Sequence, residues 1–412
     1  MKICLLNVLH EPYDKRVFQK IARSLVGAGH EVTSICPVVA ASPPRLSVPT
    51  QESRGRDKDV ASTKDGVHFQ YIPAANSLPQ RLVSVARLVV KGRRVPADVY
   101  YAPEPESWVA ALILKVFTGR KVVFDMHEHV PTEFAKFFPK FAQPFMTQLT
   151  ARFMRIFARL TDYVILTRES FEPLWAGLRV PRVVVLNTNH LQPACSEVPE
   201  ELRGRYAGKP VIIHQGIFGD VRGSYQLLDA MKLLVREIPE LLCIILGRYE
   251  YGSETHYRGA ILAAGLNEHM DLLGVVPYEE VAAHIAVARV GLILFQPGPL
   301  NHTLAMPHKL FDYMREGKPV VAPDFAVEVA RIVREADCGL LVDVAQPEKI
   351  AAAVLFLLQN QAEAARLGTN GRRLVEEKYN WQAEEQRLLR AFESLQRKNT
   401  DGHGQTRTRT DN

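Results

Sequence analysis

Short apolar runs alternate with helix-patterned segments along most of this chain, and this alternation restricts its fold more than any other feature. Lys2–Val8 predicts a buried strand, Val17–Ala28 a helix that stops at Gly29, and Glu31–Val38 a second strand. A strand, a helix and a strand in succession form a parallel unit with a crossover connection. Further strands are expected at 98–102, 121–125, 163–167 and 182–186. The first half therefore predicts an α/β domain with a parallel sheet.

The same alternation restarts after residues 191–210, a stretch of Pro, Ser and Glu that predicts a linker. Strands are expected again at 211–215, 242–247, 271–273, 290–295 and 319–322. We predict an α/β protein of two doubly wound domains, followed by a C-terminal helix and a disordered tail. The predicted bounds are 1–195 and 205–375 for the domains, 376–396 for the helix and 397–412 for the tail. Such sheets bind ligands at the carboxyl ends of their strands. Two classes of function therefore remain open: an enzyme that acts on a nucleotide-bearing substrate, or a hinged binding protein.

Charge is unevenly distributed between the halves. Residues 1–200 hold 26 Lys and Arg against 18 Asp and Glu, whereas residues 201–412 hold 25 against 27. The basic half fits an anionic partner. Nucleic acid is not expected, because nothing resembles a groove-reading module. The five cysteines are scattered without metal-ligand spacing, and no signal peptide or spanning segment is expected, so we predict a cytoplasmic protein.

The segment from Ala305 to Met314 suggests an anion site. Pro307 suits a helix start, where free backbone N–H groups and the positive end of the helix dipole attract an anion. Lys309 adds a positive charge in the first turn, and Asp312 can accept two hydrogen bonds from a ribose diol. A nucleoside diphosphate offers both groups, although the same pattern also starts helices that bind nothing.

Two further segments follow predicted strands. In His214–Gly223, Gly216 permits close backbone approach and Arg222 can clamp a diphosphate. Phe124–Pro131 places ionisable side chains at a strand's carboxyl end, which is typical of an active site. Two other interpretations of this segment are a set of hydrogen-bonded loop residues and a metal site. No third metal ligand at matching spacing is evident. Asp57-x-Asp59 resembles a metal motif but lies in a charged loop, so no metal or other cofactor is expected.

Together these segments resemble the retaining glycosyltransferases of family 4, which have two facing Rossmann-like domains (GT-B architecture). The matching pieces follow the family's order over nearly the whole chain: Tyr13–Val17, Leu25–Thr33, Asp125–Glu128, Gly216 with Arg222-Gly223, Leu246-Gly247, Gly274–Pro277, Lys309–Met314, Gly317–Val320, Gly339–Val342 and Tyr379–Trp381. The resemblance implies transfer of a sugar from a nucleotide sugar, such as a UDP- or GDP-sugar, to a glycan or lipid-linked acceptor. It also implies retention of configuration without a metal.

The resemblance also implies residue roles. Arg222 and Lys309 would neutralise the donor diphosphate, with His127 near the reacting carbon as the third catalytic residue. The donor site would comprise Gly216, Arg222, Val276, Pro307, His308, Lys309 and Asp312, with Val276 near the base and Asp312 on the ribose. The acceptor side would comprise Arg16, Asp125 and Glu128.

Three positions depart from the family pattern. Leu304 stands where the first of two Glu residues is usual, Ile217 where Arg is frequent, and Asp312 where Glu is usual. Because the first of these Glu residues usually contacts the donor sugar in the family, sugar recognition in this chain must differ from the usual pattern. The open alternatives are a sugar-nucleotide epimerase of the same architecture, which His127, Glu128 and His129 would suit, and a catalytically weak nucleotide-sugar-binding protein.

The surplus positive charge gathers beside aromatic residues. Residues 134–160 contain seven Phe and five Lys or Arg but no acid, and residues 81–94 contain five more basic residues and no acid. Aromatic and basic side chains at helical spacing are typical of a helix on an anionic membrane, although such Phe residues can also be core. Peripheral association with the inner face of the plasma membrane is therefore one expectation.

Overall fold

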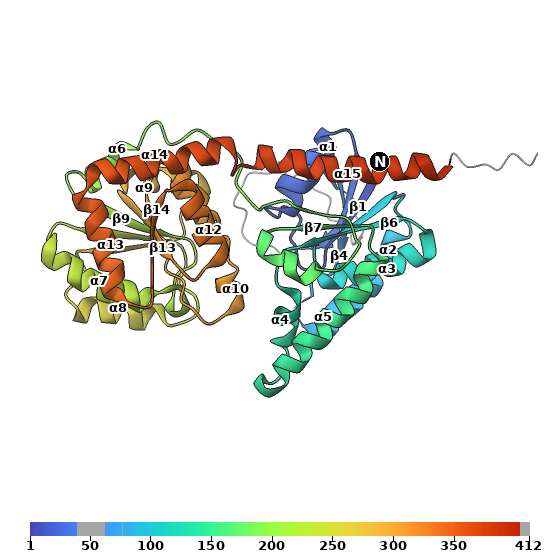
Figure 1. Cartoon of the computed structure of the whole chain (residues 1–412), viewed down its shortest axis with the longest axis horizontal. Helices are drawn as coiled ribbons and strands as arrows, with labels where there is room; N and C mark the ends of the chain where they lie inside the picture. The colour runs from blue at the N-terminus through green and yellow to red at the C-terminus, as the bar shows by residue number, and fades with distance from the viewer. Residues whose placement is uncertain (39–61, 76, 404–412) are drawn as a thin grey trace, which may run out of the picture. The chain divides into compact units, whose positions relative to one another are not determined.

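The structure, a computed structural model, describes residues 1–38, 62–75 and 77–403. These residues divide into two compact units (Figure 1). Unit 1 is formed by Met1–Leu186 together with the chain from Glu384 onward, and unit 2 by Asn187–Ala383. The mixed α/β architecture with two parallel sheets, expected from the alternation of strands and helices, is confirmed.

Unit 1 contains an eight-stranded sheet in the order β3-β4-β2-β1-β5-β6-β7-β8. All neighbouring strands are parallel except β3 and β4, which pair antiparallel. The strands are β1 (Lys2–Leu6), β2 (Glu31–Pro37), β3 (Ser62–Lys64), β4 (Val67–Ile72), β5 (Val99–Ala102), β6 (Lys121–Met126), β7 (Tyr163–Leu166) and β8 (Arg182–Val184). The helical segments are η1 (Val17–Ala22), α1 (Arg23–Gly27), α2 (Leu78–Gly92), α3 (Pro105–Thr118), α4 (Val130–Ala135), η2 (Lys140–Ala142), α5 (Gln143–Leu160) and η3 (Glu169–Trp175).

Aromatic rings fill the core beneath α3 and α5. The Trp108 indole stacks on Phe124 of β6 with ring centroids 4.0 Å apart, and Phe157 of α5 meets it edge-on at 5.5 Å. Burial of rings this large contributes strongly to stability. The segment before β4 is described from Ser62, where β3 begins. Asp57 and Asp59 lie outside the described residues.

Unit 2 contains a wholly parallel six-stranded sheet in the order β11-β10-β9-β12-β13-β14. Its strands are β9 (Val211–Gln215), β10 (Leu242–Leu246), β11 (Met270–Gly274), β12 (Val290–Leu292), β13 (Val320–Pro323) and β14 (Gly339–Val342). Its helical segments are α6 (Glu200–Arg205), η4 (Asp220–Arg222), α7 (Ser224–Glu237), α8 (Glu254–Ala263), α9 (Tyr278–Val287), α10 (Leu300–Thr303), α11 (His308–Arg315), α12 (Val327–Ala336), α13 (Pro347–Gln359) and α14 (Gln361–Glu377).

The last helix, α15 (Trp381–His403), returns from unit 2 to unit 1. Within unit 1 the buried Glu384 accepts a hydrogen bond from the Leu186 N–H (2.9 Å), and Phe392 packs near Tyr101. The described part of this helix reaches His403, so the expectation of disorder from residue 397 is wrong for 397–403. Once its first turns are docked, a helix extends through polar residues at little cost, because each further residue adds one hydrogen bond.

Candidate functional site

Lys309 is the centre of a cationic cluster in unit 2. It lies in the first turn of α11, whose N-cap is Pro307, and its Nζ is 3.0 Å from Nε2 of the buried His214 at the end of β9. Burial, and then the positive charge of Arg222, lowers the pKa of Lys309 to about 7. Among the described residues no carboxylate forms an ion pair with Lys309, so this cation lacks the neutralising partner that buried charges normally have.

The loop after β9 is shaped by glycines. Gly216 has a φ of +93°, and a Cβ there would lie 3.5 Å from Cε of Lys309. Gly219 has a φ of +144°, and a Cβ there would fall 1.6 Å from the carbonyl oxygen of Glu250, so no other residue fits. The loop therefore brings bare backbone beside the lysine.

Arg222 ends η4 directly after this loop. Its guanidinium lies 6.0 Å from the centre of the Phe295 ring, and its buried Nε has no hydrogen-bond partner among the described residues. An unpartnered buried donor normally costs about 1–3 kcal/mol, which an incoming acceptor would recover. Arg222, Lys309 and the N-terminus of α11 together form a site suited to an anion.

Asp312 and His308 of α11 are held by one side chain that the sequence analysis missed. The amide of Asn189 donates to Oδ1 of Asp312 and its oxygen pairs with Nδ1 of His308, both at 2.8 Å. Asp312 is buried, and Arg315 lies 3.7 Å from the same carboxylate oxygen. These contacts occupy Oδ1 within the fold, so the role of Asp312 toward a ribose stays a prediction. Asn189 stands far away in sequence, within a loop that carries no recognisable signal.

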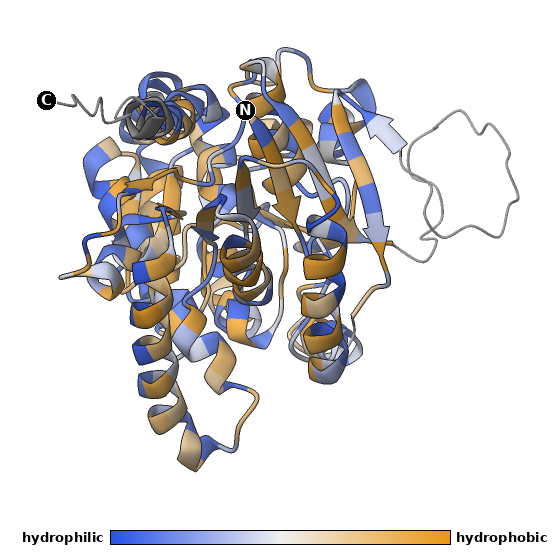
Figure 2. Ribbon diagram, turned by 90° about the vertical axis from the view of Figure 1, so that its right-hand side faces the viewer, coloured by the Kyte–Doolittle hydropathy of each residue, from blue (hydrophilic) through white to orange (hydrophobic). Residues whose placement is uncertain are grey.

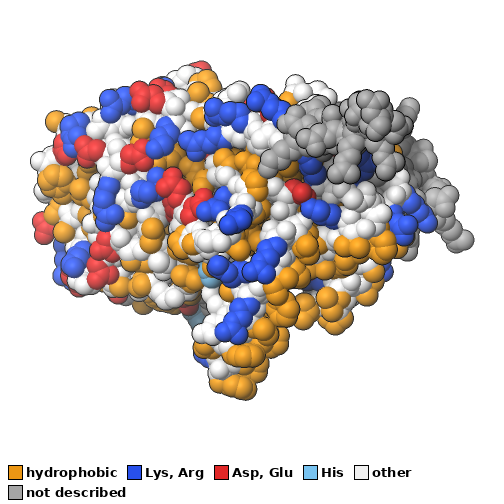
Figure 3. All heavy atoms as spheres, turned by 45° about the vertical axis from the view of Figure 1, so that its right-hand side comes forward, with side chains coloured by type: hydrophobic (Ala, Val, Ile, Leu, Met, Phe, Trp, Pro, Cys, Tyr) orange, Lys and Arg blue, Asp and Glu red, His pale blue; other side chains and the backbone are white. Residues whose placement is uncertain are grey.

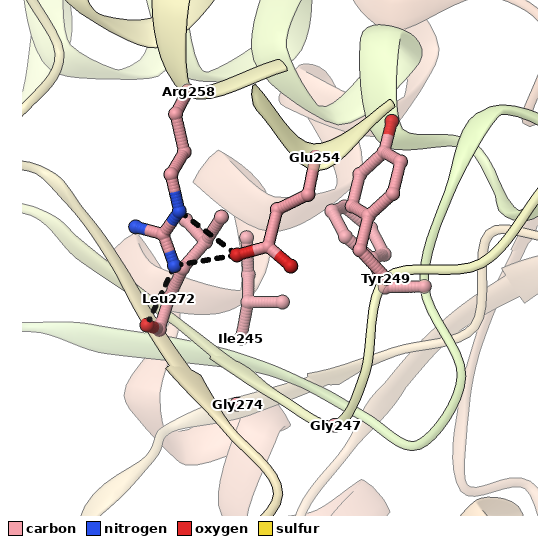
Figure 4. Close-up of a pocket in the computed structure, with 8 residues that line it drawn as sticks. Ile245, Gly247, Tyr249, Glu254, Arg258, Leu272 and Gly274 are labelled. Atoms are coloured by element: carbon pink, nitrogen blue, oxygen red, sulfur yellow. Dashed lines mark hydrogen bonds and ion pairs between the residues drawn. The ribbon is translucent and has the colours of Figure 1, made fainter. Parts of the chain in front are cut away.

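Val276 is half-buried in the loop after β11, two residues beyond Gly274, which lines the small pocket shown in Figure 4. The loops after β9, β10 and β11 are joined by backbone hydrogen bonds from Gly216 to Leu246 and from Gly247 to Gly274, both 2.7 Å. Across the pocket Arg258 and Glu254 form an ion pair at 2.8 Å. The pocket thus opens next to the segment that the sequence analysis assigned to the base.

The second group of predicted residues lies in unit 1, around Asp125 at the end of β6. Arg16 binds its carboxylate through Nε and Nη2, both at 2.9 Å, and Tyr101 and His127 donate to Oδ2. Burial opposes ionisation of Asp125, but Arg16 and His127 outweigh it and hold the pKa of this carboxyl well below its usual range. The Asp125 carboxylate therefore accepts hydrogen bonds from three side chains at once, and this arrangement suits it to holding Arg16 and His127 in position.

His127 is the member of this group that remains partly exposed, at 16% of its side chain. Burial lowers its pKa below 6.5, so the ring is neutral at pH 7. Because Nε2 lies 2.8 Å from the Asp125 carboxylate, the proton belongs on Nε2 and the lone pair on Nδ1. Glu128, in contrast, lies exposed in the loop before α4.

His10 and Glu104 complete this edge of the sheet and were not predicted. The Glu104 carboxylate accepts hydrogen bonds from the N–H groups of Val8, Leu9 and His10, at 2.7–2.9 Å, and so fixes the loop after β1. The His10 ring lies edge-on to His127 with centroids 5.0 Å apart. Although burial opposes its charged form, the hydrogen bond to Asp14 and the charge of Glu104 raise the pKa of His10 above 6.5.

Leu304, at the C-cap of α10, is half-buried and supplies no acid to the anion site. No group of three or more His, Cys, Asp or Glu side chains that could hold a metal occurs among the described residues. Among these residues, too, no helix is both long and apolar enough to cross a membrane.

Two family models match this chain. The model for glycosyl transferases group 1 matches residues 201–374, which lie in unit 2. The model for the glycosyl transferase 4-like domain matches residues 15–189, almost all in unit 1. Together the two glycosyltransferase models match most of the chain, and the chain is identified as a glycosyltransferase. This glycosyltransferase therefore carries Lys309 and Arg222 in its group 1 domain and the Asp125 group in its 4-like domain.

Relatives and a solved structure agree with this assignment. The glycosyltransferase is 24% identical to phosphatidyl-myo-inositol mannosyltransferase of Mycobacterium leprae over 87% of both chains. It is 23% identical to spore coat protein SA of Bacillus subtilis, over 55% of this chain and 59% of that protein. Its structure is similar to that of Anabaena HepE, solved in complex with UDP, with a TM-score of 0.71 and 16% identity over 96% of this chain and 100% of HepE. The expected GT-B fold is confirmed.

Proposed function

We propose that this glycosyltransferase transfers a sugar from a UDP- or GDP-sugar to a glycan or lipid-linked acceptor, with retention of anomeric configuration. The observation that carries the proposal is the cluster of Lys309 and Arg222 at the N-terminus of α11, in which no described carboxylate forms an ion pair with Lys309. A diphosphate is the anion that would fill such a site, with Gly216 letting its oxygens approach the backbone. HepE, a structural relative, was solved with UDP and with UDP-glucose.

Departure of the nucleoside diphosphate places negative charge on the leaving phosphate in the transition state. Lys309, Arg222 and the free N–H groups of α11 would stabilise that charge, and one such preorganised donor is worth about 10²–10³ in rate. The proposal assigns this work to protein cations and needs no metal ion. Val276 and its neighbours would lie near the base.

In unit 1, His127 would contact the donor sugar near the reacting carbon. Its neutral ring offers Nδ1 as a hydrogen-bond acceptor for a sugar hydroxyl, because Asp125 holds the proton on Nε2. Asp125 would keep the ring in that orientation, and Arg16 would hold Asp125 in place. The lipid-linked class of acceptor is supported by the name of the mycobacterial relative, a phosphatidyl-myo-inositol mannosyltransferase.

The first test is a thermal-shift panel of UDP, GDP, ADP and their sugars. A nucleotide at 100 times its Kd stabilises the protein by about 2.7 kcal/mol, which is easily measured. Lys309→Gln and Arg222→Gln should greatly reduce the shift, whereas Lys349→Gln, which changes an exposed lysine of α13, should retain it. With the donor identified, NMR of the product's anomeric proton distinguishes retention from inversion. Failure of every nucleotide to shift the transition would overturn the donor-site assignment.

A further inference from the structure

Helix α5 presents apolar side chains on two opposite sides. On its inner side Met154 and Ala158 are buried, and Phe157 packs against Trp108 of α3. On its outer side lie four large apolar residues with half or more of their surface exposed: Phe145 (64%), Phe153 (50%), Ile156 (51%) and Leu160 (51%). Together with Leu149 they recur at steps of three or four residues, so they share one helix face. We call these five residues the outer face of α5.

The outer face continues to an aromatic tip. The chain between α4 and α5 carries Phe137 (51% exposed) and Phe141 (88% exposed), and Phe134 of α4 lies beside Phe137. In Figure 3 hydrophobic side chains cover the end of the lower protrusion, where Figure 1 places α4 and α5. Figure 2 shows the same helical projection with apolar and polar residues interleaved along it. Aromatic rings this exposed at a projecting tip are rare in a surface that faces only water.

Neighbouring helices extend the apolar surface. Exposed residues of α2 and α3 lie in the same helical layer as α5: Leu82, Val83, Val90, Val116 and Phe117. The Arg81 guanidinium of α2 lies 5.5 Å from the Phe137 ring, and that of Arg93 lies 5.0 Å from Phe117. Three helices therefore contribute to one exposed surface of unit 1.

The charges along α5 are all positive, and Glu133 of the neighbouring α4 is paired with Lys136. Arg152, Arg155 and Arg159 run along the edge of the outer face, and Lys140 precedes the helix. None of these four has an ion-pair partner among the described residues, although Arg155 donates to the Ala176 carbonyl. Residues 134–160 contain no Asp or Glu. A surface with apolar centre and unpaired cationic edge is complementary to an apolar layer bounded by negative charge.

We propose that the outer face of α5 and the aromatic tip dock on an anionic lipid bilayer. The Phe rings would enter the boundary between headgroups and acyl chains, while the arginines would lie at the level of the lipid phosphates. The negative phosphates of such a bilayer complement the arginines of α5, a helix that carries no Asp or Glu. The proposal does not depend on which donor or acceptor the enzyme uses.

The test is cosedimentation of the full-length protein with vesicles at low salt. Wild type should sediment with vesicles of phosphatidylcholine and phosphatidylglycerol, remain in the supernatant with phosphatidylcholine alone, and be released by high salt. In Arg152→Gln/Arg155→Gln/Arg159→Gln the partition coefficient should fall by about 100-fold, at about fivefold per arginine. The matched control Lys209→Gln/Arg236→Gln/Arg373→Gln removes three exposed charges from unit 2 and should bind like wild type.

A second variant tests the apolar contribution. Phe141→Ser/Phe145→Ser keeps every charge and should also release the protein from anionic vesicles. The circular dichroism spectrum and the unfolding temperature should remain those of wild type, which separates loss of docking from loss of folding. Wild type left in the supernatant with anionic vesicles would overturn the proposal, and so would equal binding by the arginine triple variant. Concentration-dependent dimerisation that Phe145→Ser abolishes would assign the surface to a second copy of the chain and likewise overturn it.

Discussion

The Nζ of Lys309 lies 3.0 Å from Nε2 of His214, and the positive charge of Arg222 also acts on it. Burial and the charge of Lys309 hold the pKa of His214 well below 6.5, so this imidazole is neutral and accepts from the lysine. The pair thus fixes the lysine without neutralising it. A cation held in this way remains available to an anion, and this property leads to the first prediction.

UDP binding should take up a proton at pH 8. The free Lys309, with a pKa of about 7, is mostly neutral at that pH, and a diphosphate oxygen beside it favours the charged form. The uptake by Lys309 should approach one proton at pH 8 and disappear at pH 5.5, where the lysine is already charged and any remaining exchange comes from the UDP phosphate. Calorimetry at pH 8 in Tris and in HEPES, whose ionisation enthalpies differ, measures it. Lys309→Gln should bind weakly without uptake, and identical wild-type enthalpies in both buffers would contradict the prediction.

Arg222→Gln should lower the transfer rate by about 10²–10³ and leave the free energy of unfolding nearly unchanged. The rate falls because a donor aimed at the departing diphosphate is lost. Stability is retained because the Arg222 Nε has no hydrogen-bond partner among the described residues. Steady-state kinetics and urea titration measure the two quantities. Arg222→Lys should recover part of the rate, and a large loss of stability in either variant would instead indicate a structural role.

Much of the fold could be predicted from the sequence because its strands are short, apolar and regularly interrupted. The expected strands at 2–8, 31–38 and 211–215 correspond to β1, β2 and β9. The segment of β14, Gly339–Val342, was recognised only as a family motif. It is short and half-buried, so its hydrophobic periodicity alone predicts a strand only weakly. Register and sheet order depend on long-range pairing, which local patterns do not encode.

The candidate site could be predicted only where a motif surrounds the residue. Lys309, Arg222 and His127 follow strands or start helices, and the structure places each at a carboxyl edge or helix start. Asn189 and Glu104 act through contacts that span 123 and 96 positions in sequence, so no local pattern reveals them. Asp312 was expected to bind the ribose hydroxyls because it carries a carboxylate. Its burial and its hydrogen bond with Asn189 depend on tertiary packing, which the residue type does not reveal.

Asp125→Asn should destabilise the protein by about 3–5 kcal/mol, because it leaves the buried Arg16 charge without its ion-pair partner. Urea unfolding followed by circular dichroism measures the change. Glu254→Gln is the matched control: it breaks the exposed pair with Arg258 and should cost less than about 1 kcal/mol. Similar losses in the two variants would contradict the assignment of Asp125 as the anchor of this edge.

His10→Asn should destabilise the protein more at pH 5.5 than at pH 8.5. The pKa of His10 in the folded protein is raised above its usual 6.5 by Asp14 and Glu104, despite its burial. A raised pKa stabilises the fold below the unfolded-state pKa, and that stabilisation is lost as the pH rises through the folded-state pKa. The difference in unfolding free energy between wild type and variant should therefore shrink toward pH 8.5.

The control for His10 is His256→Asn on α8, which removes an exposed histidine and should give the same small difference at both pH values. The histidine–carboxylate contact responsible for the effect is the 3.3 Å approach of His10 Nδ1 to Asp14. Asp14→Asn should consequently remove most of the pH dependence of the His10 substitution in a double-mutant cycle. An equal cost of His10→Asn at pH 5.5 and pH 8.5 would mean that the ring beside His127 is neutral throughout, and that the loop after β1 is held by Glu104 alone.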